Sequence, residues 1–214
     1  GSYPKRGKKV LFTKSISKSY YMRVSTIALV SAMMATEVYA ADETITDDRT
    51  SSTTTTDELG AGAGTLTIDS GGSITVTSGT ALTVNGPHNL VQTGSITSED
   101  LAAGRGLFLD ASTANLLADI TVDGTINVAA PEDTFDDDET PTSNIGLELS
   151  GAFGLTGDIT VTENGDINVW GGDSRGLLLG SNMTGDLTNN GEITTVGSRS
   201  VAVDIQGNLT GTFL

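Results

Sequence analysis

The sequence predicts an all-β protein built as a parallel β-helix, or β-solenoid, with about three short strands in each coil. Stretches after residue 64 alternate apolar and polar residues and are separated by glycine and serine, a pattern typical of strands joined by tight turns. Three short phrases then return in a fixed order along the second half of the chain, which is typical of a stacked repeat.

Residues 1–40 are expected to be a signal peptide with an extended basic n-region. Arg23 gives a positive start, residues 24–35 form a largely apolar run, and Val38-Tyr39-Ala40 supplies a small-x-small pattern before a cut between Ala40 and Ala41. A transmembrane helix is the alternative interpretation, but the run is shorter than the ~20 residues that a bilayer needs. The sequence therefore predicts export through the Sec machinery.

The charge of the chain is divided at the same place. Residues 1–40 carry seven Lys or Arg and one acid, whereas residues 41–214 carry four Arg and 26 acids, so that +6 and −22 give the −16 of the whole chain. Such an acidic region repels the phosphates of nucleic acids, and no nucleic-acid partner is expected. The chain has no Cys, which excludes disulfides, thiolate zinc sites and Cys nucleophiles.

Residues 41–64 are rich in Thr, Ser and Gly and are expected to be a flexible lead-in. From Thr65 onward the stretches TLTID, SITVT and ALTVN alternate apolar and polar residues. Residues 65–214 are therefore assigned to the β-helical repeats, which are expected to be incomplete at the C-terminal end. The apolar residues expected to share an inward face are Leu66, Ile68, Ile74, Val76, Leu82 and Val84.

Three phrases make up each repeat, and each phrase is predicted to form one strand. The first reads GSIT from Gly94, GTINV from Gly124, GDINV from Gly165 and GEITTV from Gly191; the second reads RGLFL from Arg105, IGLEL from Ile145, RGLLL from Arg175 and RSVAV from Arg199; the third reads LADITV from Leu117, LTGDITV from Leu155, MTGDLTN from Met183 and LTGTF from Leu209. The first phrases are 30, 41 and 26 residues apart, and the long spacing contains the 11 residues of Pro131–Pro141, so that 30 remain without them.

Stacking is expected to place Ile167 over Ile126, and Leu178 over Leu147 or Leu149 of a neighbouring coil. A β-sandwich also uses many short strands. The fixed order of the three phrases favours the β-helix.

The stretch GDSRG around Ser174 fits the G-x-S-x-G pattern that surrounds the nucleophilic serine of many hydrolases. The same place in the other repeats is assigned to Gly104, Asn144 and Ser198, and such residues interchange where the chain turns. A hydrolase also needs a strand-to-helix turn and a His partner, whereas no helix is predicted here and the one His, His88, lies in an earlier coil. Ser174 is therefore predicted to be a turn residue, and no catalytic residue is assigned.

The sequence contains three further groups of candidate site residues. The acidic stretch in the 131–141 insertion is expected to be a solvated loop, and it is also a weak Ca²⁺ candidate through Asp133, Asp136, Asp137, Asp138 and Glu139. His88, after Gly-Pro, is expected in a solvent-exposed turn. Trp170 and Phe153 are candidate sugar-stacking residues, although Trp170 ends a predicted strand and can instead cap a coil. No cofactor is expected.

The signal peptide, the absence of Cys and the degenerate "G-x-I-x-V…R-G-L-x-L…T-G-D-I-T" coils together resemble the passenger region of bacterial autotransporters, the type V secreted proteins. The likeness covers about residues 22–214 and lies in the style of the repeat rather than in any single motif. It implies a right-handed β-helix carried to the surface of a Gram-negative cell through a C-terminal outer-membrane barrel, which is expected beyond residue 214.

The function expected from this resemblance is that of an exported cell-surface passenger, a structural stalk or adhesin without catalysis in this part of the chain. The alternative is a β-helical carbohydrate-active enzyme or polysaccharide-binding protein. An enzyme of that kind would need acids and bases clustered on one solvent-facing sheet, and only one column of Arg residues is predicted, from Arg105, Arg175 and Arg199.

Overall fold

The computed structural model of the chain describes residues 41–129 and 142–214. The signal peptide expected in residues 1–40, with its cut after Ala40, lies outside the described residues, as does the weak Ca²⁺ candidate at Asp133–Glu139. Throughout the described ranges, neighbouring strands pair in parallel and form four sheets. A β-sandwich, which relies on antiparallel pairing, is therefore wrong for this part of the chain.

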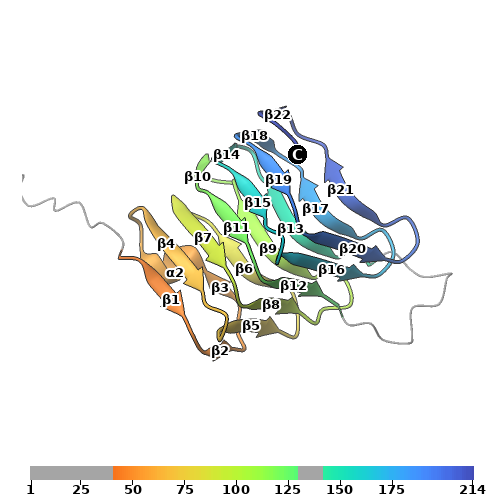
Figure 1. The fold of residues 1–214 in the computed structure, drawn as a ribbon, viewed down its shortest axis with the longest axis horizontal. Coiled ribbons are helices and arrows are strands. Elements are labelled where there is room, and N and C mark those ends of the chain that lie inside the picture. The colour runs from red at the N-terminus through yellow and green to blue at the C-terminus, as the bar shows by residue number, and fades with distance from the viewer. Residues whose placement is uncertain (1–40, 130–141) are drawn as a thin grey trace, which may run out of the picture. The chain divides into compact units, whose positions relative to one another are not determined.

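The four sheets, here named A to D, each contain strands from successive circuits of the chain (Figure 1). Sheet A holds β1 (Glu43–Ile45), β4 (Gly64–Ile68), β7 (His88–Gln92), β11 (Ile120–Val122), β15 (Ile159–Val161) and β19 (Leu187–Asn189). Sheet B holds β2 (Asp48–Arg49), β5 (Ser73–Val76), β8 (Ser95–Ser98), β12 (Thr125–Val128), β16 (Asp166–Trp170) and β20 (Glu192–Val196). Sheet C holds β3 (Thr53–Thr54), β6 (Thr80–Val84), β9 (Arg105–Asp110), β13 (Ile145–Ser150), β17 (Arg175–Leu179) and β21 (Val201–Ile205). Sheet D holds β10 (Leu116–Leu117), β14 (Gly154–Thr156), β18 (Asn182–Thr184) and β22 (Leu209–Thr210).

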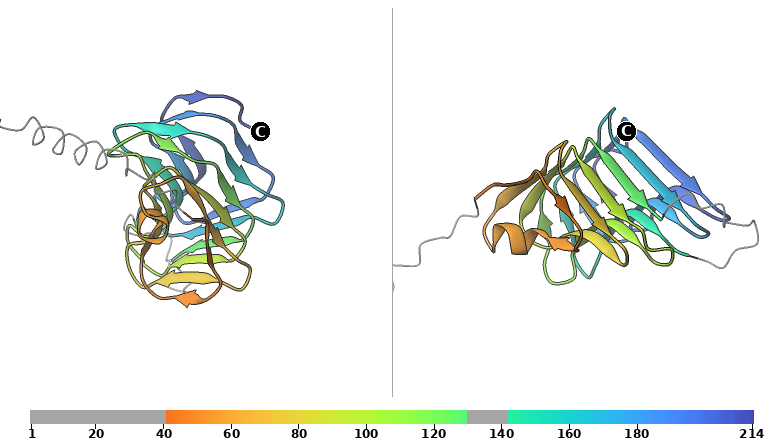
Figure 2. Two further views of the ribbon diagram at one scale, coloured as in Figure 1. Left: turned by 90° about the vertical axis from the view of Figure 1, so that its left-hand side faces the viewer. Right: turned by 90° about the horizontal axis from the view of Figure 1, so that it is seen from below.

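The chain visits sheets A, B and C in turn and, from β10 onward, passes through sheet D before it returns to sheet A. Strands that pair are therefore one circuit apart in the sequence, and Figure 2 (right) shows them lying side by side in rows. This stacking of parallel sheets is the arrangement of a β-solenoid. None of the helices within the described ranges is long and apolar enough to cross a membrane.

The segment 41–64, expected to be a flexible lead-in, instead belongs to the stack. It carries β1, β2, β3 and the helix α2 (Thr55–Leu59), which begins at an N-cap, Thr54, whose hydroxyl accepts the N–H of Asp57 at 3.1 Å. Ile45 pairs with Ile68 of β4 and is fully buried. Strands of two or three residues are too short for alternation to be visible in the sequence, and pairing with the next circuit is what orders them.

The core consists of apolar columns that run through the stack. The predicted inward-facing residues are all buried, and in sheet B the column is Ile74, Ile96, Ile126 and Ile167. Burying each such side chain stabilises the fold by ~1.5–3 kcal/mol. The prediction that Ile167 lies over Ile126 is confirmed.

The prediction for Leu178 is wrong. Leu178 pairs with Glu148 and faces outward, while Leu177 and Leu179 pair with Leu147 and Leu149 in the core. The inward–outward alternation is interrupted at Gly176. Both Gly176 and the next residue, Leu177, are buried, so Leu178 is the residue that faces outward. An added Cβ at Gly176 would overlap the Cγ2 atom of Ile193, so this position allows sheets B and C to approach closely.

The third phrase, expected to form one strand, is bent into two. In the phrase LTGDITV the strands β14 and β15 are separated by Gly157 and Asp158. Gly157 has φ +140°, and an added Cβ there would overlap the carbonyl oxygen of Ala118. The Asp158 side chain in turn accepts the backbone N–H of Asp186 at 2.8 Å, in the next circuit. The phrase therefore encodes a corner between sheets D and A.

Candidate functional site

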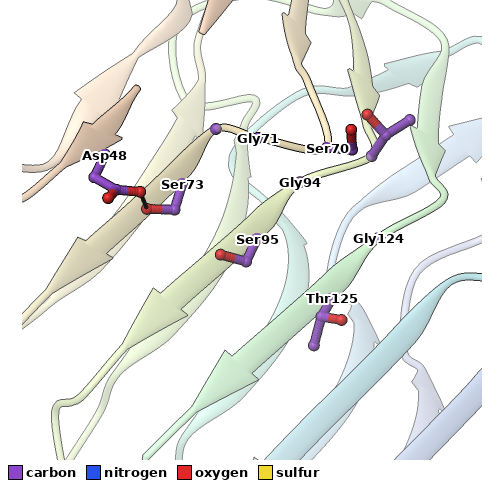
Figure 3. Close-up of a pocket in the computed structure, with 10 residues that line it drawn as sticks. Asp48, Ser70, Gly71, Ser73, Gly94, Ser95, Gly124 and Thr125 are labelled. Carbon is purple, nitrogen blue, oxygen red and sulfur yellow. Dashed lines mark hydrogen bonds between the residues drawn. The ribbon is translucent and has the colours of Figure 1, made fainter. Parts of the chain in front are cut away.

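A polar groove of about 370 Å³ lies where the chain turns from sheet A into sheet B (Figure 3). Its wall is formed by the loop Ser70–Gly72, and its floor by the starts of β5, β8 and β12. The residues that line it are Ser, Thr, Gly and one Asp. The residues at the groove are Asp48, Ser70, Gly71, Gly72, Ser73, Thr93, Gly94, Ser95, Gly124 and Thr125.

The groove arises from a difference in corner length. Four residues, 69–72, join β4 to β5, whereas only Thr93 and Gly94 join β7 to β8, and two residues also join β11 to β12. The short corners lie close against the circuit before them. An added Cβ at Gly94 would overlap the carbonyl oxygens of Asp69 and Gly72, and one at Gly124 would overlap that of Gly94. The longer loop therefore stands as a wall beside a low floor of glycine backbone.

Hydroxyl groups form a row along this floor. Ser73, Ser95 and Thr125 pair with one another in the register of β5, β8 and β12, and each is half-buried and faces outward. Neighbouring strands in a sheet are ~4.8 Å apart, which sets the spacing of the row. Asp48 of β2 lies before Ser73 and accepts a hydrogen bond from its hydroxyl at 2.7 Å (Figure 3). We call Ser73, Ser95 and Thr125 the hydroxyl row.

A buried amide lies beneath the floor. Gln92 is fully buried in a column of sheet A in which the neighbouring positions are Ile68 and Val122. Its Nε2 donates to the carbonyl oxygens of Gly94 and, at 3.3 Å, of Thr125, both of which line the groove. Its Oε1 is buried without a hydrogen-bond partner, which costs about 1–3 kcal/mol. Gln92 thus connects the core to the groove floor, and sequence analysis did not single it out.

The four Arg of residues 41–214 are all in ion pairs, and none lines the groove. The pairs are Arg49 with Glu58, Arg105 with Glu148, Arg175 with Asp204 at 2.8 Å, and Arg199 with Asp173 at 2.6 Å. The hydrogen bond from Arg175 holds the pKa of the Asp204 carboxyl below its usual value, and Arg199 does the same for the pKa of Asp173.

The predicted Arg column is only partly confirmed. Arg105 and Arg175 occupy the same register position on sheet C, with Ile145 between them. The prediction for Arg199 is wrong, because the residue that pairs with Arg175 is Val201. The spacing between circuits does not change here, because Trp170 pairs with Val196 and Arg175 with Val201, each 26 residues further on, so the phrase predicted to begin at Arg199 begins at Val201.

Ser174 lies in the turn between β16 and β17, as the repeat predicts, and is fully buried. Its Oγ lies 3.3 Å from Oγ1 of Thr142, and its backbone N–H donates to Oγ of Ser200 at 3.2 Å. Because Arg175 pairs with Val201, the residue equivalent to Ser174 in the last circuit is Ser200 rather than the expected Ser198. The residue before it, Asp173, has φ +57°, the left-handed conformation of a turn.

The left-handed turn before Ser174 recurs through the stack. Ala103, Ser143, Asp173 and Arg199 have φ between +56° and +63°. They precede Gly104, Asn144, Ser174 and Ser200 respectively. A repeated backbone conformation thus explains the serine of the GDSRG stretch.

The expectation that His88 lies in a solvent-exposed turn is wrong, because His88 begins β7 and is fully buried. Its Nε2 lies 2.9 Å from the carbonyl oxygen of Gly62, and its Nδ1 lies 2.9 Å from Oγ1 of Thr55. Since a carbonyl only accepts, Nε2 carries the proton and Nδ1 accepts the Thr55 hydroxyl. Burial lowers the pKa of His88 and favours this neutral form.

The two aromatic candidates lie apart from the groove lining. Trp170 ends β16 and is half-buried, and its carbonyl accepts the side-chain N–H of Asn144 at 2.8 Å. Phe153 is 50% exposed between β13 and β14. Across residues 41–129 and 142–214, no three His, Asp or Glu side chains come together to hold a metal ion.

No family model matches the chain, and neither a curated protein nor a solved structure is significantly similar to it.

Proposed function

We propose that the chain is an exported, surface-displayed passenger similar to those of bacterial autotransporters, and that its stacked sheets serve as a structural and adhesive surface. The observation that supports this most directly is the set of continuous apolar columns, such as Ile74, Ile96, Ile126 and Ile167. They give a rigid stack whose outward-facing residues are free to vary and to bind partners. A right-handed β-helix, passage through the Sec machinery and a C-terminal outer-membrane barrel belong to this proposal.

The arrangement of the titratable side chains supports a non-catalytic role for this part of the chain. Ser174 is buried among turn residues between sheets B and C, whereas His88 begins β7 in sheet A and is engaged by Thr55 and Gly62. A lyase of acidic polysaccharides needs a cation near its substrate, whereas the arginines of the described residues are held by carboxylates. These contacts favour structural roles for each group.

A second candidate function, polysaccharide binding, is favoured by the groove at the corner of sheets A and B. Its hydroxyl row is outward-facing and repeated from strand to strand, which suits an extended ligand. This candidate is compatible with display at a cell surface.

The test of the proposed function is labelling of intact cells. Antibodies raised against residues 41–214 should label the source bacterium without permeabilisation, and external protease should remove the signal. A cytoplasmic protein that stays unlabelled in the same intact cells is the control. Labelling that requires permeabilisation would contradict surface display.

A further inference from the structure

We infer that the groove at the corner of sheets A and B is a binding site for a neutral carbohydrate chain that lies across β5, β8 and β12. The inference rests on the adhesive role proposed above and names the class of ligand for one part of that surface. A hollow of about 370 Å³ is in the range in which proteins bind small organic ligands.

The hydrogen-bonding capacity of the groove matches a polyol. The hydroxyls of Ser73, Ser95 and Thr125 can both donate and accept, as sugar hydroxyls also can. The Ser73 hydroxyl donates to one carboxylate oxygen of Asp48, so the Ser73 oxygen can still accept a hydrogen bond and the second oxygen of Asp48 can accept one from a ligand hydroxyl. No aromatic residue lines the groove, so recognition relies on hydrogen bonds.

Charge selects against acidic ligands. No Arg or Lys lines the groove, and the region from residue 41 onward carries a net charge of −22, from four Arg and 26 acids. Sulfated, phosphorylated or uronic acid chains would be repelled by this field. A neutral sugar meets no such repulsion, and the single carboxylate of Asp48 serves it as a hydrogen-bond acceptor.

The regular spacing of the hydroxyl groups in the groove fits a linear polymer. Ser73, Ser95 and Thr125 lie on neighbouring strands in register, so a similar group recurs every ~4.8 Å along the stack. A carbohydrate chain running across the strands can place successive rings against successive strands. Individually weak contacts then add through multivalency.

Gln92 is the positioning residue of this floor. Its amide fixes the carbonyls of Gly94 and Thr125 from below, at a core position where the circuits before and after have Ile68 and Val122. An apolar residue would pack there without an unpaired buried oxygen. A polar side chain at this place points to a requirement for a defined floor rather than for core stability.

The experiment measures binding of cellohexaose, mannohexaose and maltohexaose to the full chain by calorimetry, with hexagalacturonate as the acidic comparison. At least one neutral hexasaccharide should bind, and hexagalacturonate should not. Ser95→Ala and Thr125→Val should each weaken binding by about fivefold, the effect of losing one hydrogen bond. Thr194→Val, on β20 and outside the groove, is the matched control and should bind like the parent.

A further variant, Gln92→Val, separates positioning from folding. It should weaken binding while the melting temperature stays equal or rises, because the unpaired oxygen is removed. The inference is overturned if none of the three neutral probes binds, if binding is unchanged in both groove variants, or if hexagalacturonate binds as tightly. Circular dichroism verifies the fold of each variant, and surface labelling of intact cells is independent of these results. A displayed protein that binds no probe therefore refutes the ligand class and leaves the proposed function standing.

Discussion

The side chain of Asp158 accepts the backbone N–H of Asp186, one circuit further along the chain, at 2.8 Å. The same bond joins Asp119 to the N–H of Asp158 at 2.9 Å, and Asp186 to the N–H of Thr212 at 2.7 Å. Each aspartate thus satisfies a backbone donor at the corner between sheets D and A, where the ladder of strand hydrogen bonds is interrupted. This contact gives a physical reason for the recurring Gly-Asp in the third phrase.

The first prediction follows from this ladder. Asp158→Ala should lower the free energy of unfolding by about 1 kcal/mol, because the N–H of Asp186 loses its acceptor. Asp158→Asn keeps an acceptor oxygen and removes a negative charge from a column of stacked aspartates, so it should be as stable as the parent or more so at low ionic strength. Urea unfolding of both variants decides this, and equal destabilisation by Ala and Asn would contradict it.

The second prediction compares two glycines with positive φ. At Gly157 (φ +140°) an added Cβ would overlap a carbonyl oxygen, whereas at Gly79 (φ +75°) nothing lies within 4 Å. Gly79→Ala should cost only the backbone strain, about 1–2 kcal/mol. Gly157→Ala should cost clearly more, since strands of sheets D and A must shift. Thermal melts of both variants test this, and similar costs would mean that the corner is more adaptable than the packing indicates.

The third prediction concerns pH. Because the pKa of His88 is lowered in the folded chain, the unfolded state binds a proton first as the pH falls through about 6.5. Stability from neutral His88 is therefore present above that pH and is lost as the pH drops from about 6.5 toward the folded pKa. His88→Gln should flatten this part of the curve. The melting temperature measured between neutral pH and pH 5.5 tests it, and an identical slope in parent and variant would exclude His88 as the cause.

The core columns could be predicted from the sequence because each phrase repeats with its apolar residues at fixed places. Ile126 and Ile167 are aligned by the phrases that contain them, and the structure stacks them as expected. The prediction failed where register depends on something outside the phrase. Leu178 was assigned inward because a run of three leucines hides which two face the core. Val201, rather than Arg199, pairs with Arg175 because the two turns before these strands are equally long, four residues each, and the likeness of RSVAV to RGLLL does not set the register.

The groove and the burial of His88 were beyond sequence reasoning for a related cause. His88 is buried by Thr55 and Gly62, which belong to a segment without visible periodicity. The groove results from the unequal lengths of corners in neighbouring circuits, and its buried support, Gln92, is a polar residue in an apolar column. Such features appear only when distant segments are brought side by side.

The fourth prediction concerns Ser174. Ser174→Ala should leave any ester or peptide hydrolysis by the parent unchanged, because the side chain is buried in a turn whose equivalent residues include Gly104 and Asn144. A fluorophosphonate should not label the folded protein. Labelling that disappears in the variant, or an activity that disappears with it, would overturn the interpretation of this serine as a turn residue.

The last prediction concerns the end of the stack formed by β20 and β21, which are the outermost strands of sheets B and C within the described residues. Three apolar residues on these strands, Val196, Val201 and Ile205, are 38–47% exposed. Strands with unpaired N–H and C=O groups and exposed apolar residues pair with other chains. We expect residues 41–214, prepared alone, to associate end to end in solution.

The net charge of −22, from four Arg and 26 acids, opposes this association by repulsion between copies, which salt screens. Association should therefore increase with ionic strength, and Val201→Lys, which places a solvated charge on the edge strand, should reduce it at every salt concentration. Phe153→Lys, at an exposed position between β13 and β14, which have paired strands on both sides, is the matched control and should associate like the parent. Light scattering measures the mass directly, and a parent that stays a monomer at high salt would contradict the role assigned to this edge.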